Sequence, residues 1–284
     1  MIPHKFEYTV PKNLDDALHL LASGAKPLAG GMSLIPMMKL RLATPERLVD
    51  LAKLQELNYI RESGGELHIG ATATHYDVES SALLLRKCPL LAETAAAIGD
   101  LQVRNMGTIG GSVAHADPAA DYPAALQALE AKLVLKSGKS ERTVAVKDFF
   151  QDAFTTALGP EEIVLEIVLP AEDTATGTLY EKVVQPASGF AIVGIAVRIR
   201  RSAGKIGFVR VGVTGIANCS YRATAAEAAL EGKVGLDADI EAAAALVATG
   251  VDANSDLHAS ADYRRHLAEV YAARAIAKAL SRCA

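Results

Sequence analysis

Two short glycine clusters constrain the fold of this chain more than any other feature of its sequence. The second cluster lies within residues 100–121 and contains Gly107, Gly110 and Gly111, with hydroxyl side chains between them. Because glycine lacks a Cβ, successive backbone N–H groups there can come close to an anion such as a phosphate. Taken alone, these glycines are equally consistent with a tight turn between two strands.

The first cluster lies within residues 29–40, where the sequence reads AGGMSLIPMMKL. Gly30 and Gly31 are followed by Ser33 and then by an apolar run with helical spacing. Ser33 can cap that helix, and the partial positive charge at a helix N-terminus favours a phosphate. The two clusters together predict one ligand site, in which both glycine pairs open onto a shared cavity.

Length and composition narrow the class of protein. The 284 residues are enough for two modest domains with cores of their own. Half of the residues are hydrophobic and the net charge is −4, so the composition gives no support for nucleic-acid binding. Cys88, Cys219 and Cys283 lie far apart, which argues against a disulfide framework and against a metal-binding CxxC motif. An iron–sulfur cluster needs clustered thiolates, so any such cluster would have to lie on another chain.

Targeting signals and common catalytic motifs are missing from the sequence. The N-terminal residues MIPHKFEYTVPKN lack the apolar core of a signal peptide, and no apolar run is long enough to span a bilayer. We therefore expect a cytoplasmic protein without a transmembrane segment. The motifs HExxH, GxSxG, GxxxxGKS and GxGxxG are absent too, so zinc protease, serine hydrolase, P-loop and Rossmann sites have no support.

The hydrophobic pattern divides the chain at residues 171–177, a polar stretch of small residues that is the best candidate for a linker. Before it, the pattern predicts interspersed strands and helices, with hairpins around residues 63–65 and 137–138 and with Asn13 and Thr74 as N-caps. After it come three long strands and three Ala-rich helices, which should cover one face of a small antiparallel sheet. The expected strands are residues 5–10, 26–29, 47–51, 59–61, 66–70, 132–136, 143–146, 163–169, 178–184, 191–200 and 206–216. The expected helices are residues 14–23, 33–40, 75–81, 89–98, 122–130, 224–230, 238–248 and 261–280.

The segments AGGMSLIP and RNMGTIGGSVAHADPAADYP resemble the two flavin motifs of the FAD-binding medium subunit of molybdenum hydroxylases. That family includes the medium chains of carbon monoxide dehydrogenases and the FAD domains of xanthine dehydrogenases. The resemblance runs along the whole chain, because PMMKLR (residues 36–41), PLLAETAAAIGDLQVRN (residues 89–105) and the part after about residue 177 are also similar to the family. The carbon monoxide dehydrogenase type is nearest by eye, which does not fix the substrate.

The resemblance implies an α+β fold in two parts. Residues 1–172 would form a PCMH-type FAD-binding domain, which is vanillyl-alcohol-oxidase-like, with subdomains at about residues 1–57 and 58–172. Residues 177–284 would form a C-terminal domain like that of carbon monoxide dehydrogenase flavoproteins, with a small antiparallel sheet covered by helices.

The resemblance also implies that the chain is an electron-transfer subunit of a molybdenum-containing oxidoreductase. It would hold FAD non-covalently and pass electrons from [2Fe-2S] clusters on a small partner subunit to an external acceptor. A large partner subunit would carry the molybdopterin cofactor, in a dimer of heterotrimers. We expect no catalytic side chain and no metal ligand on this chain, since electron transfer needs position and electrostatics from the protein.

The resemblance assigns site residues position by position. Asp121 matches an aspartate that contacts the flavin in the family, although its place at the start of a helix also suits an N-cap. Lys182 matches a family lysine and would bring a positive charge to the cofactor. Phe190 falls where the carbon monoxide dehydrogenase type has an aromatic residue near the ring, with core packing as the alternative. A backbone contact would fall at Ile163 or Val164. The full set implied for FAD binding is Lys26, Ala29, Gly30, Gly31, Met32, Ser33, Leu34, Ile35, Gly107, Thr108, Ile109, Gly110, Gly111, Ser112, Asp121, Ile163, Lys182 and Phe190.

Several side chains near the second cluster stay open. His115 could be a general base, a covalent flavin anchor or a polar wall of the site. Pairing of Asp117 with Asp121 for acid–base catalysis is disfavoured by their spacing across a proline. His68 and His75 are expected at the surface or in a hairpin.

Two departures from the family pattern leave side-chain contacts unassigned. Met32 stands where relatives often have His or Gln, and Ser112 stands where Asp or Asn is common. Neither change removes a binding site made of backbone N–H groups, since such groups do not depend on the side chain.

Two other functions remain as alternatives. One is a stand-alone flavoprotein oxidase or reductase of the same superfamily, which would need a substrate pocket of its own. The other is a nucleotide-binding module without redox chemistry. For the expected subunit, the large partner would choose the substrate, so carbon monoxide, a purine alkaloid, a nicotine derivative, an aldehyde and an aromatic acyl thioester all stay open, as does the acceptor.

Overall fold

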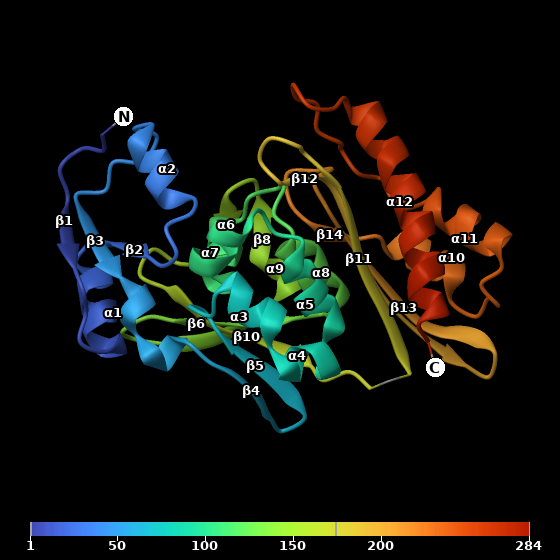
Figure 1. Cartoon of the computed structure of the whole chain (residues 1–284), viewed down its shortest axis with the longest axis horizontal. Coiled ribbons are helices and arrows are strands. Elements are labelled where there is room, and N and C mark those ends of the chain that lie inside the picture. The colour runs from blue at the N-terminus through green and yellow to red at the C-terminus, as the bar shows by residue number, and fades with distance from the viewer. Residues whose placement is uncertain (1, 174, 284) are drawn as a thin grey trace.

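The computed structural model of the protein describes residues 2–173 and 175–283. Its main sheets follow one another along the long axis of the molecule, with the N-terminal part at one end and the C-terminal part at the other (Figure 1). Helices and small sheets are mixed throughout, which confirms the predicted α+β class.

The N-terminal part is a small parallel sheet, ordered β1-β3-β2, with helix α1 against it. Asn13 caps α1 as predicted, because its side chain accepts a hydrogen bond from the N–H of Asp16 at 2.8 Å. Leu18 and Leu21 of α1 are buried in a core that also contains Val49. The elements are β1 (Glu7–Thr9), α1 (Leu14–Ala22), β2 (Lys26–Leu28), α2 (Leu34–Lys39), β3 (Arg47–Asp50), η1 (Leu51–Lys53) and η2 (Gln55–Leu57).

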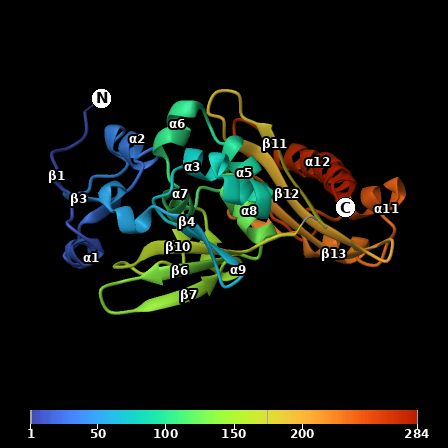
Figure 2. The ribbon, with the colours of Figure 1, turned by 60° about the horizontal axis from the view of Figure 1, so that its bottom comes forward.

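The middle part contains a five-stranded antiparallel sheet, ordered β4-β5-β10-β6-β7. Leu67 and Ile69 of β5 are fully buried beneath helices, while His68 between them lies on the other face, as strand alternation requires. Figure 2 shows the helices gathered on one side of this sheet. The strands are β4 (Ile60–Ser63), β5 (Glu66–Gly70), β6 (Lys132–Lys136), β7 (Glu141–Ala145) and β10 (Ile163–Pro170), and a small hairpin is formed by β8 (Phe150–Asp152) and β9 (Thr155–Thr156).

The helices of the middle part fill the space between two sheets. Thr74 begins α3 with the predicted cap, since its hydroxyl accepts a hydrogen bond from the N–H of Asp77 at 3.1 Å and the Asp77 carboxylate bonds back. Helices α5 and α8 share one core with the five-stranded sheet and with Tyr180 and Ala196 of the next sheet. The helices are α3 (His75–Ser80), α4 (Ala82–Lys87), α5 (Pro89–Ala96), α6 (Leu101–Met106), α7 (Ile109–His115), α8 (Tyr122–Ala128) and α9 (Val146–Phe149).

The C-terminal part is a four-stranded antiparallel sheet, ordered β11-β12-β13-β14, between two helical layers. Helices α10 to α12 share a separate core with its outer face, as predicted. On the inner face, α8 comes so close that a Cβ at Gly212 would overlap the carbonyl oxygen of Ala124. The elements are β11 (Thr176–Val184), β12 (Ala191–Ser202), β13 (Lys205–Thr214), β14 (Tyr221–Arg222), α10 (Thr224–Leu230), α11 (Asp237–Ala244) and α12 (Ala261–Ser281).

The structure corrects the sequence analysis at two places near the second glycine cluster. The cluster is not a loop, because helix α7 begins at Ile109 and includes Gly110 and Gly111. Glycine has a low helix propensity, but the Thr108 hydroxyl caps this helix and neighbouring backbone fixes its first turn. His75 is not a surface residue, since it is only 4% exposed. The pattern also missed the short helices α4, α6 and α9, which have too few residues for a clear period.

Within residues 2–173 and 175–283, no helix is both long enough and apolar enough to cross a bilayer.

Candidate functional site

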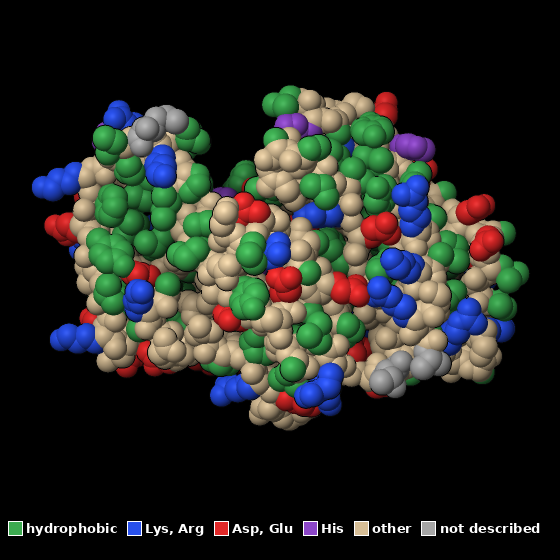
Figure 3. All heavy atoms as spheres, in the orientation of Figure 1, with side chains coloured by type: hydrophobic (Ala, Val, Ile, Leu, Met, Phe, Trp, Pro, Cys, Tyr) green, Lys and Arg blue, Asp and Glu red, His purple; other side chains and the backbone are tan. Residues whose placement is uncertain are grey.

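A hollow opens where three separate stretches of the chain meet, between the N-terminal part and the rest of the molecule. Figure 3 shows the surface hollowed at this place. The hollow measures about 130 Å³. The stretches are the turn before α2, the chain from α3 to α8, and the turn between β11 and β12. The lining residues are Met32, Ser33, His75, Ile98, Gly99, Val103, Ser112, His115, Asp117, Ala120, Asp121, Ser188, Gly189 and Phe190.

The turn before α2 presents a run of free backbone donors. Within the part of the chain that the structure describes, none of the N–H groups from Gly30 to Leu34 donates a hydrogen bond. Gly31 has a positive φ of 73°, a conformation that favours glycine and that turns successive amides toward one side. Gly30 and Gly31 are buried, and buried amides without an acceptor are costly. The turn is therefore suited to a ligand with several acceptor oxygens.

The two glycine clusters lie against each other. A Cβ at Gly30 would overlap the carbonyl oxygen of Met106 and would come within 2.7 Å of the Cα of Gly107. A Cβ at Gly111 would lie 3.7 Å from the Cβ of Ala29. The clusters are therefore in contact, but their glycines are not among the residues that line the hollow, and the contact itself, rather than a ligand, explains why residue 30 is glycine.

The amides of the second cluster are not free, contrary to expectation. The N–H of Ile109 donates to the carbonyl of Ala73 at 3.0 Å, and the N–H of Gly110 donates to the carbonyl of Ala71 at 2.9 Å. The N–H of Gly111 donates to the Thr108 hydroxyl at 3.1 Å. Gly110 is packed so tightly that a Cβ there would lie 2.5 Å from that of Ala71. These residues support the wall, and it is the first cluster whose backbone N–H groups are free to donate to a ligand.

Serine hydroxyls line the hollow from both sides. Ser33 occupies the N-cap position of α2, but its side chain makes no capping hydrogen bond, so the predicted cap is wrong. Ser112 faces the same hollow from α7. Because a hydroxyl can both donate and accept, the pair can bind phosphate oxygens or sugar hydroxyls.

Asp121 is held by partners on β11. Its backbone lies at the N-cap of α8, but the carboxylate does not cap the helix, so that alternative is wrong. The Tyr180 hydroxyl donates to Asp121 Oδ1 at 2.5 Å, and Lys182 Nζ lies 2.9 Å from Oδ1 and 3.1 Å from Oδ2. Asp121 and Lys182 are about 4% and 5% exposed at their side chains. Burial raises the pKa of the Asp121 carboxyl, while Lys182 and Tyr180 pull this pKa back down.

His75 forms part of the floor of the hollow. Its Nδ1 lies 3.2 Å from the Tyr122 hydroxyl, and a Cβ at Gly107 would approach its Nε2 to 2.5 Å. Burial, and to a smaller extent the charge of Arg104, lowers the pKa of His75 to about 4. The imidazole is therefore neutral at physiological pH.

The structure places His115 and Asp117 on the wall of the hollow. The His115 ring lies 5.1 Å from the ring of Phe154, centroid to centroid. Burial lowers the pKa of His115, Asp117 raises it, and Lys26 lowers it again. The Asp117 carboxylate accepts a hydrogen bond from the N–H of Ala119 at 2.9 Å, which is a local turn contact. Among the residues that the structure describes, neither His115 nor Asp117 forms a hydrogen bond or an ion pair with Asp121.

The remaining expected residues are divided between the hollow and its surroundings. Phe190 is 40% exposed and lines the hollow, so it is not a core residue. Ile163 is 4% exposed and packs in the N-terminal core with α1. Ile35 packs onto Gly31, where its Cδ1 would lie 2.6 Å from an added Cβ. Lys182 reaches the hollow only through Asp121 and the turn at Gly189.

Sequence reasoning missed several residues of the wall. They are His75, Ile98, Gly99, Val103, Ala120, Ser188 and Gly189. Only Gly99 carried a local signal, because a glycine between a helix and the N-cap Asp100 marks a turn with positive φ. The others carry no local signal. Ala120 and Gly189 are next to expected residues, but only the tertiary fold shows that they face the hollow.

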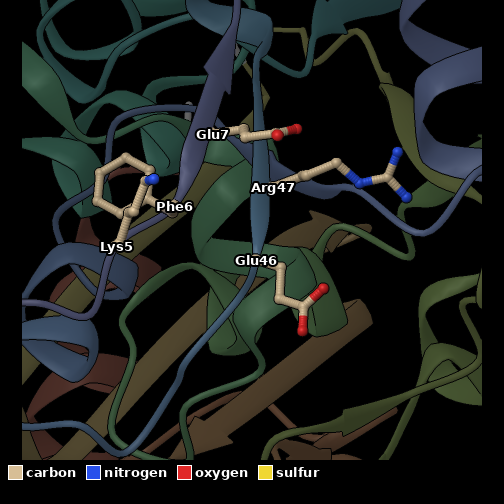
Figure 4. Close-up of a pocket in the computed structure, with 5 residues that line it drawn as sticks. All are labelled: Lys5, Phe6, Glu7, Glu46 and Arg47. Carbon is tan, nitrogen blue, oxygen red and sulfur yellow. The ribbon is translucent and has the colours of Figure 1, made fainter.

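A wider hollow of about 490 Å³ lies at the edge of the N-terminal sheet, lined by Lys5, Phe6, Glu7, Glu46 and Arg47. Figure 4 shows that these side chains point in different directions and do not converge on one point. It lies where the paired strands β1 and β3 begin, and it includes neither glycine cluster. Volume alone therefore does not identify the site, and the smaller hollow with its free amides is the better candidate.

The chemistry available in the smaller hollow is binding rather than catalysis. No group of three or more His, Cys, Asp or Glu side chains suited to a metal ion occurs among the residues described. The buried ion pair, the neutral imidazole and the free donors can hold and orient a ligand, but they do not form a nucleophile with an adjacent base.

Comparison with known proteins places this geometry in context. Residues 4–172 match the family model described as the FAD binding domain in molybdopterin dehydrogenase, and residues 178–279 match that of the CO dehydrogenase flavoprotein C-terminal domain. The carbon monoxide dehydrogenase medium chain of Hydrogenophaga pseudoflava is 40% identical over 287 residues, covering 100% of both chains. The glyceraldehyde dehydrogenase medium chain of Sulfolobus acidocaldarius is 37% identical, covering 97% of this chain and 98% of the relative. The crystal structure of the Hydrogenophaga pseudoflava carbon monoxide dehydrogenase that lacks the Mo-pyranopterin moiety superposes with a TM-score of 0.97 at 43% identity, over 100% of both chains.

Proposed function

Because this chain belongs to the family of FAD-binding medium subunits of molybdenum-containing dehydrogenases, we propose that it carries electrons from a partner's iron–sulfur clusters to an external acceptor through FAD. The observation that carries the proposal is the run of unpaired amides from Gly30 to Leu34 at the edge of the hollow. Gly30 and Gly31 are buried, so their amides need acceptor oxygens, and a dinucleotide supplies them with its pyrophosphate. We also propose that residues 1–172 and 177–284 act as two domains.

The residues of the hollow fit FAD in chemistry as well as in position. We assign the pyrophosphate to the amides of residues 30–34, with the hydroxyls of Ser33 and Ser112 beside them. We assign the planar ring to the side of the hollow where Phe190 offers an aromatic surface. No binding role is assigned to the amides of Ile109 to Gly111, since these already have partners.

FAD, when bound, supplies the one-electron chemistry that no side chain of the hollow can perform. The chain's own residues have three tasks. The turn at residues 30–34 binds, the side chains of His75 and Val103 shield the pocket from water, and the Asp121–Lys182 pair fixes the wall. Each of these tasks concerns position and electrostatics, and none requires a proton to be transferred.

The partners follow from the family. Relatives of this chain are named as medium chains or subunits, so we propose a large subunit with the molybdopterin cofactor and a small subunit with [2Fe-2S] clusters, arranged as a dimer of heterotrimers. The large subunit would determine the substrate. Carbon monoxide, glyceraldehyde and caffeine are substrates in the names of relatives, and identity of 32–40% does not choose among them.

The proposal is tested by purifying the tagged chain from its native host. We expect two companion chains, molybdenum and iron in the complex, and a flavin spectrum that disappears when FAD is removed. A Ser33→Ala, Ser112→Ala double variant should lose FAD faster, whereas a Gly138→Ala change in an exposed hairpin should not.

Each alternative function has a distinct outcome in the same experiment. A lone, colourless chain that binds ordinary nucleotides would establish a non-redox module. A yellow chain that oxidises a substrate without companions would establish a stand-alone enzyme.

A further inference from the structure

The ammonium group of Lys182 is buried and bonded within the chain, so it is not available to contact a ligand. An ammonium group has three N–H donors. Here its nitrogen lies 2.9 Å and 3.1 Å from the two carboxylate oxygens of Asp121 and 2.7 Å from the carbonyl oxygen of Gly189. The side chain is 5% exposed. The ammonium therefore donates to the Asp121 carboxylate and to the Gly189 carbonyl within the chain, and its charge is neutralised by a carboxylate that is buried as well.

The carbonyl that Lys182 binds belongs to the turn between β11 and β12, which forms one wall of the hollow. Figures 1 and 2 both show this turn reaching toward α6. The turn is held together by its own bonds, because the N–H groups of Gln185 and Gly189 bond to Phe190 and Gln185. The Ser188 hydroxyl adds a further bond to the Gln185 side chain at 2.8 Å. Because these bonds fix the shape of the turn, the contacts that join it to the rest of the wall set its position.

Two anchors fix the turn to the rest of the wall. One is the bond from Lys182 to the carbonyl of Gly189. The other is a backbone contact, since a Cβ at Gly189 would lie 3.1 Å from the Cα of Gly99. Gly189 has a φ of 77°, so any other residue would be strained there as well. Beyond the turn, the N–H of Ala191 bonds to the carbonyl of Ala119 at 3.1 Å.

We propose that Lys182 is a positioning residue, which retains FAD by fixing the 185–190 turn against the hollow through the carbonyl of Gly189, and not by contacting the cofactor itself. This inference rests on the proposed function of the hollow. It assigns Asp121 the task of holding the Lys182 ammonium in place, with the Tyr180 hydroxyl orienting the carboxylate. Phe190, next to the anchored carbonyl, is thereby held at the mouth.

The test is a double-variant cycle on the flavin-loaded complex, with FAD release followed by the rise in flavin fluorescence. Lys182→Met removes one anchor and Gly189→Ala displaces the other. Each should speed FAD release about tenfold or more, because losing the hydrogen bond between the Lys182 ammonium and the turn should change the release rate by at least a factor of about ten. Both act through the same turn, so the double variant should release FAD no faster than the faster single variant.

Matched controls separate this effect from strain and from lost surface charge. Gly64→Ala introduces alanine at a φ of 61° in a hairpin with no neighbour within 4 Å, and Lys132→Met removes an exposed strand lysine. Neither should change FAD release. Hydrogen exchange of the amides at residues 185–191 should rise in Lys182→Met, and this readout does not depend on activity.

Three outcomes would overturn the inference. If the fold-increase in FAD release of the double variant equals the product of the two single-variant increases, Lys182 and Gly189 act on FAD independently. Unchanged amide exchange in Lys182→Met would show that the turn is not anchored by this lysine. Recovery of slow release in Asp121→Asn, Lys182→Met, which removes the buried unpaired charge, would show that the single variant acted through that charge. A wild-type complex without flavin would instead refute the proposed function.

Discussion

The buried histidine under the hollow makes the stability of this protein depend on pH in a calculable way. His75 is 4% exposed, and its pKa is lowered to about 4 by burial and then by Arg104, from an ordinary value of 6.5. The unfolded chain therefore takes up a proton near pH 6.5, which the native state takes up only near pH 4. Between these values the unfolded state binds more protons, so the free energy of unfolding falls as the pH falls.

The size of the effect follows from the difference between the two pKa values. The complete loss, reached below pH 4, corresponds to about 3 kcal/mol, and about 2 kcal/mol of it is already lost at pH 5. Above pH 6.5 the contribution is fully present. Because stability margins are commonly 5–15 kcal/mol, a loss of about this size should be easy to measure.

The assay is urea unfolding followed by circular dichroism from pH 7.5 to pH 4.5. In His75→Asn the amide can still reach the Tyr122 hydroxyl but does not titrate, so the variant should be less stable than wild type at pH 7.5 and should lose about 2 kcal/mol less on going to pH 5. His258→Asn, at an exposed position, should keep the wild-type pH dependence. Parallel stability curves for wild type and His75→Asn would refute the reasoning, since they would mean that the native imidazole accepts a proton as easily as the unfolded one.

Three further predictions concern the two glycine clusters. Gly30→Ala should lower the free energy of unfolding by about 3 kcal/mol, because the carbonyl of Met106 cannot rotate away from the new Cβ. Gly138→Ala, with open space around it, should change this free energy little. Equal urea midpoints for the two variants would contradict the packing argument. Thr108→Val should cost about 1 kcal/mol in the same assay, since it removes the side-chain cap of α7. Ser33→Ala should leave the unfolding free energy within about 0.5 kcal/mol of wild type, because its hydroxyl caps nothing, but should weaken FAD binding about tenfold by fluorescence titration; a stability loss without a binding loss would show that the hydroxyl serves the fold.

Much of the fold was predictable because its longer elements have regular patterns. The alternation in β5 and the β-branched runs of β12 and β13 are strong signals, and the caps at Asn13 and Thr74 mark where α1 and α3 begin. Helix α7 was not predictable in this way. Its first turn is Ile-Gly-Gly, and it is helical because the backbone carbonyls of Ala71 and Ala73 accept its first amides.

The site was predictable to the extent that local sequence encodes it. The free amides after Gly30 and the hydroxyl of Ser33 belong to a single turn, and a turn has a sequence signature. The role of Lys182 could not be found from sequence, because it depends on Asp121 and Gly189, which are 61 and 7 residues away along the chain. The ion pair joins the start of α8 to β11, so it becomes visible only when the packing of that helix on the sheet is known.

The glycines of this site therefore divide into two physical groups, and the division changes what a substitution there would mean. Gly30 and Gly110 are glycine because other parts of the chain occupy the space of a Cβ. A larger residue at position 30 would separate the clusters, one at position 110 would push α7 away from Ala71, and both would affect FAD only indirectly. Gly31 has a positive φ and begins the turn of free donors, so a change there would alter the direction of the amides while leaving the contact between the clusters in place. A glycine-rich motif is commonly interpreted as a place where backbone meets ligand. In this protein the glycines first allow two backbone segments to pack against each other. That contact, between Gly30 and residues 106–107, holds the binding turn at the edge of the hollow.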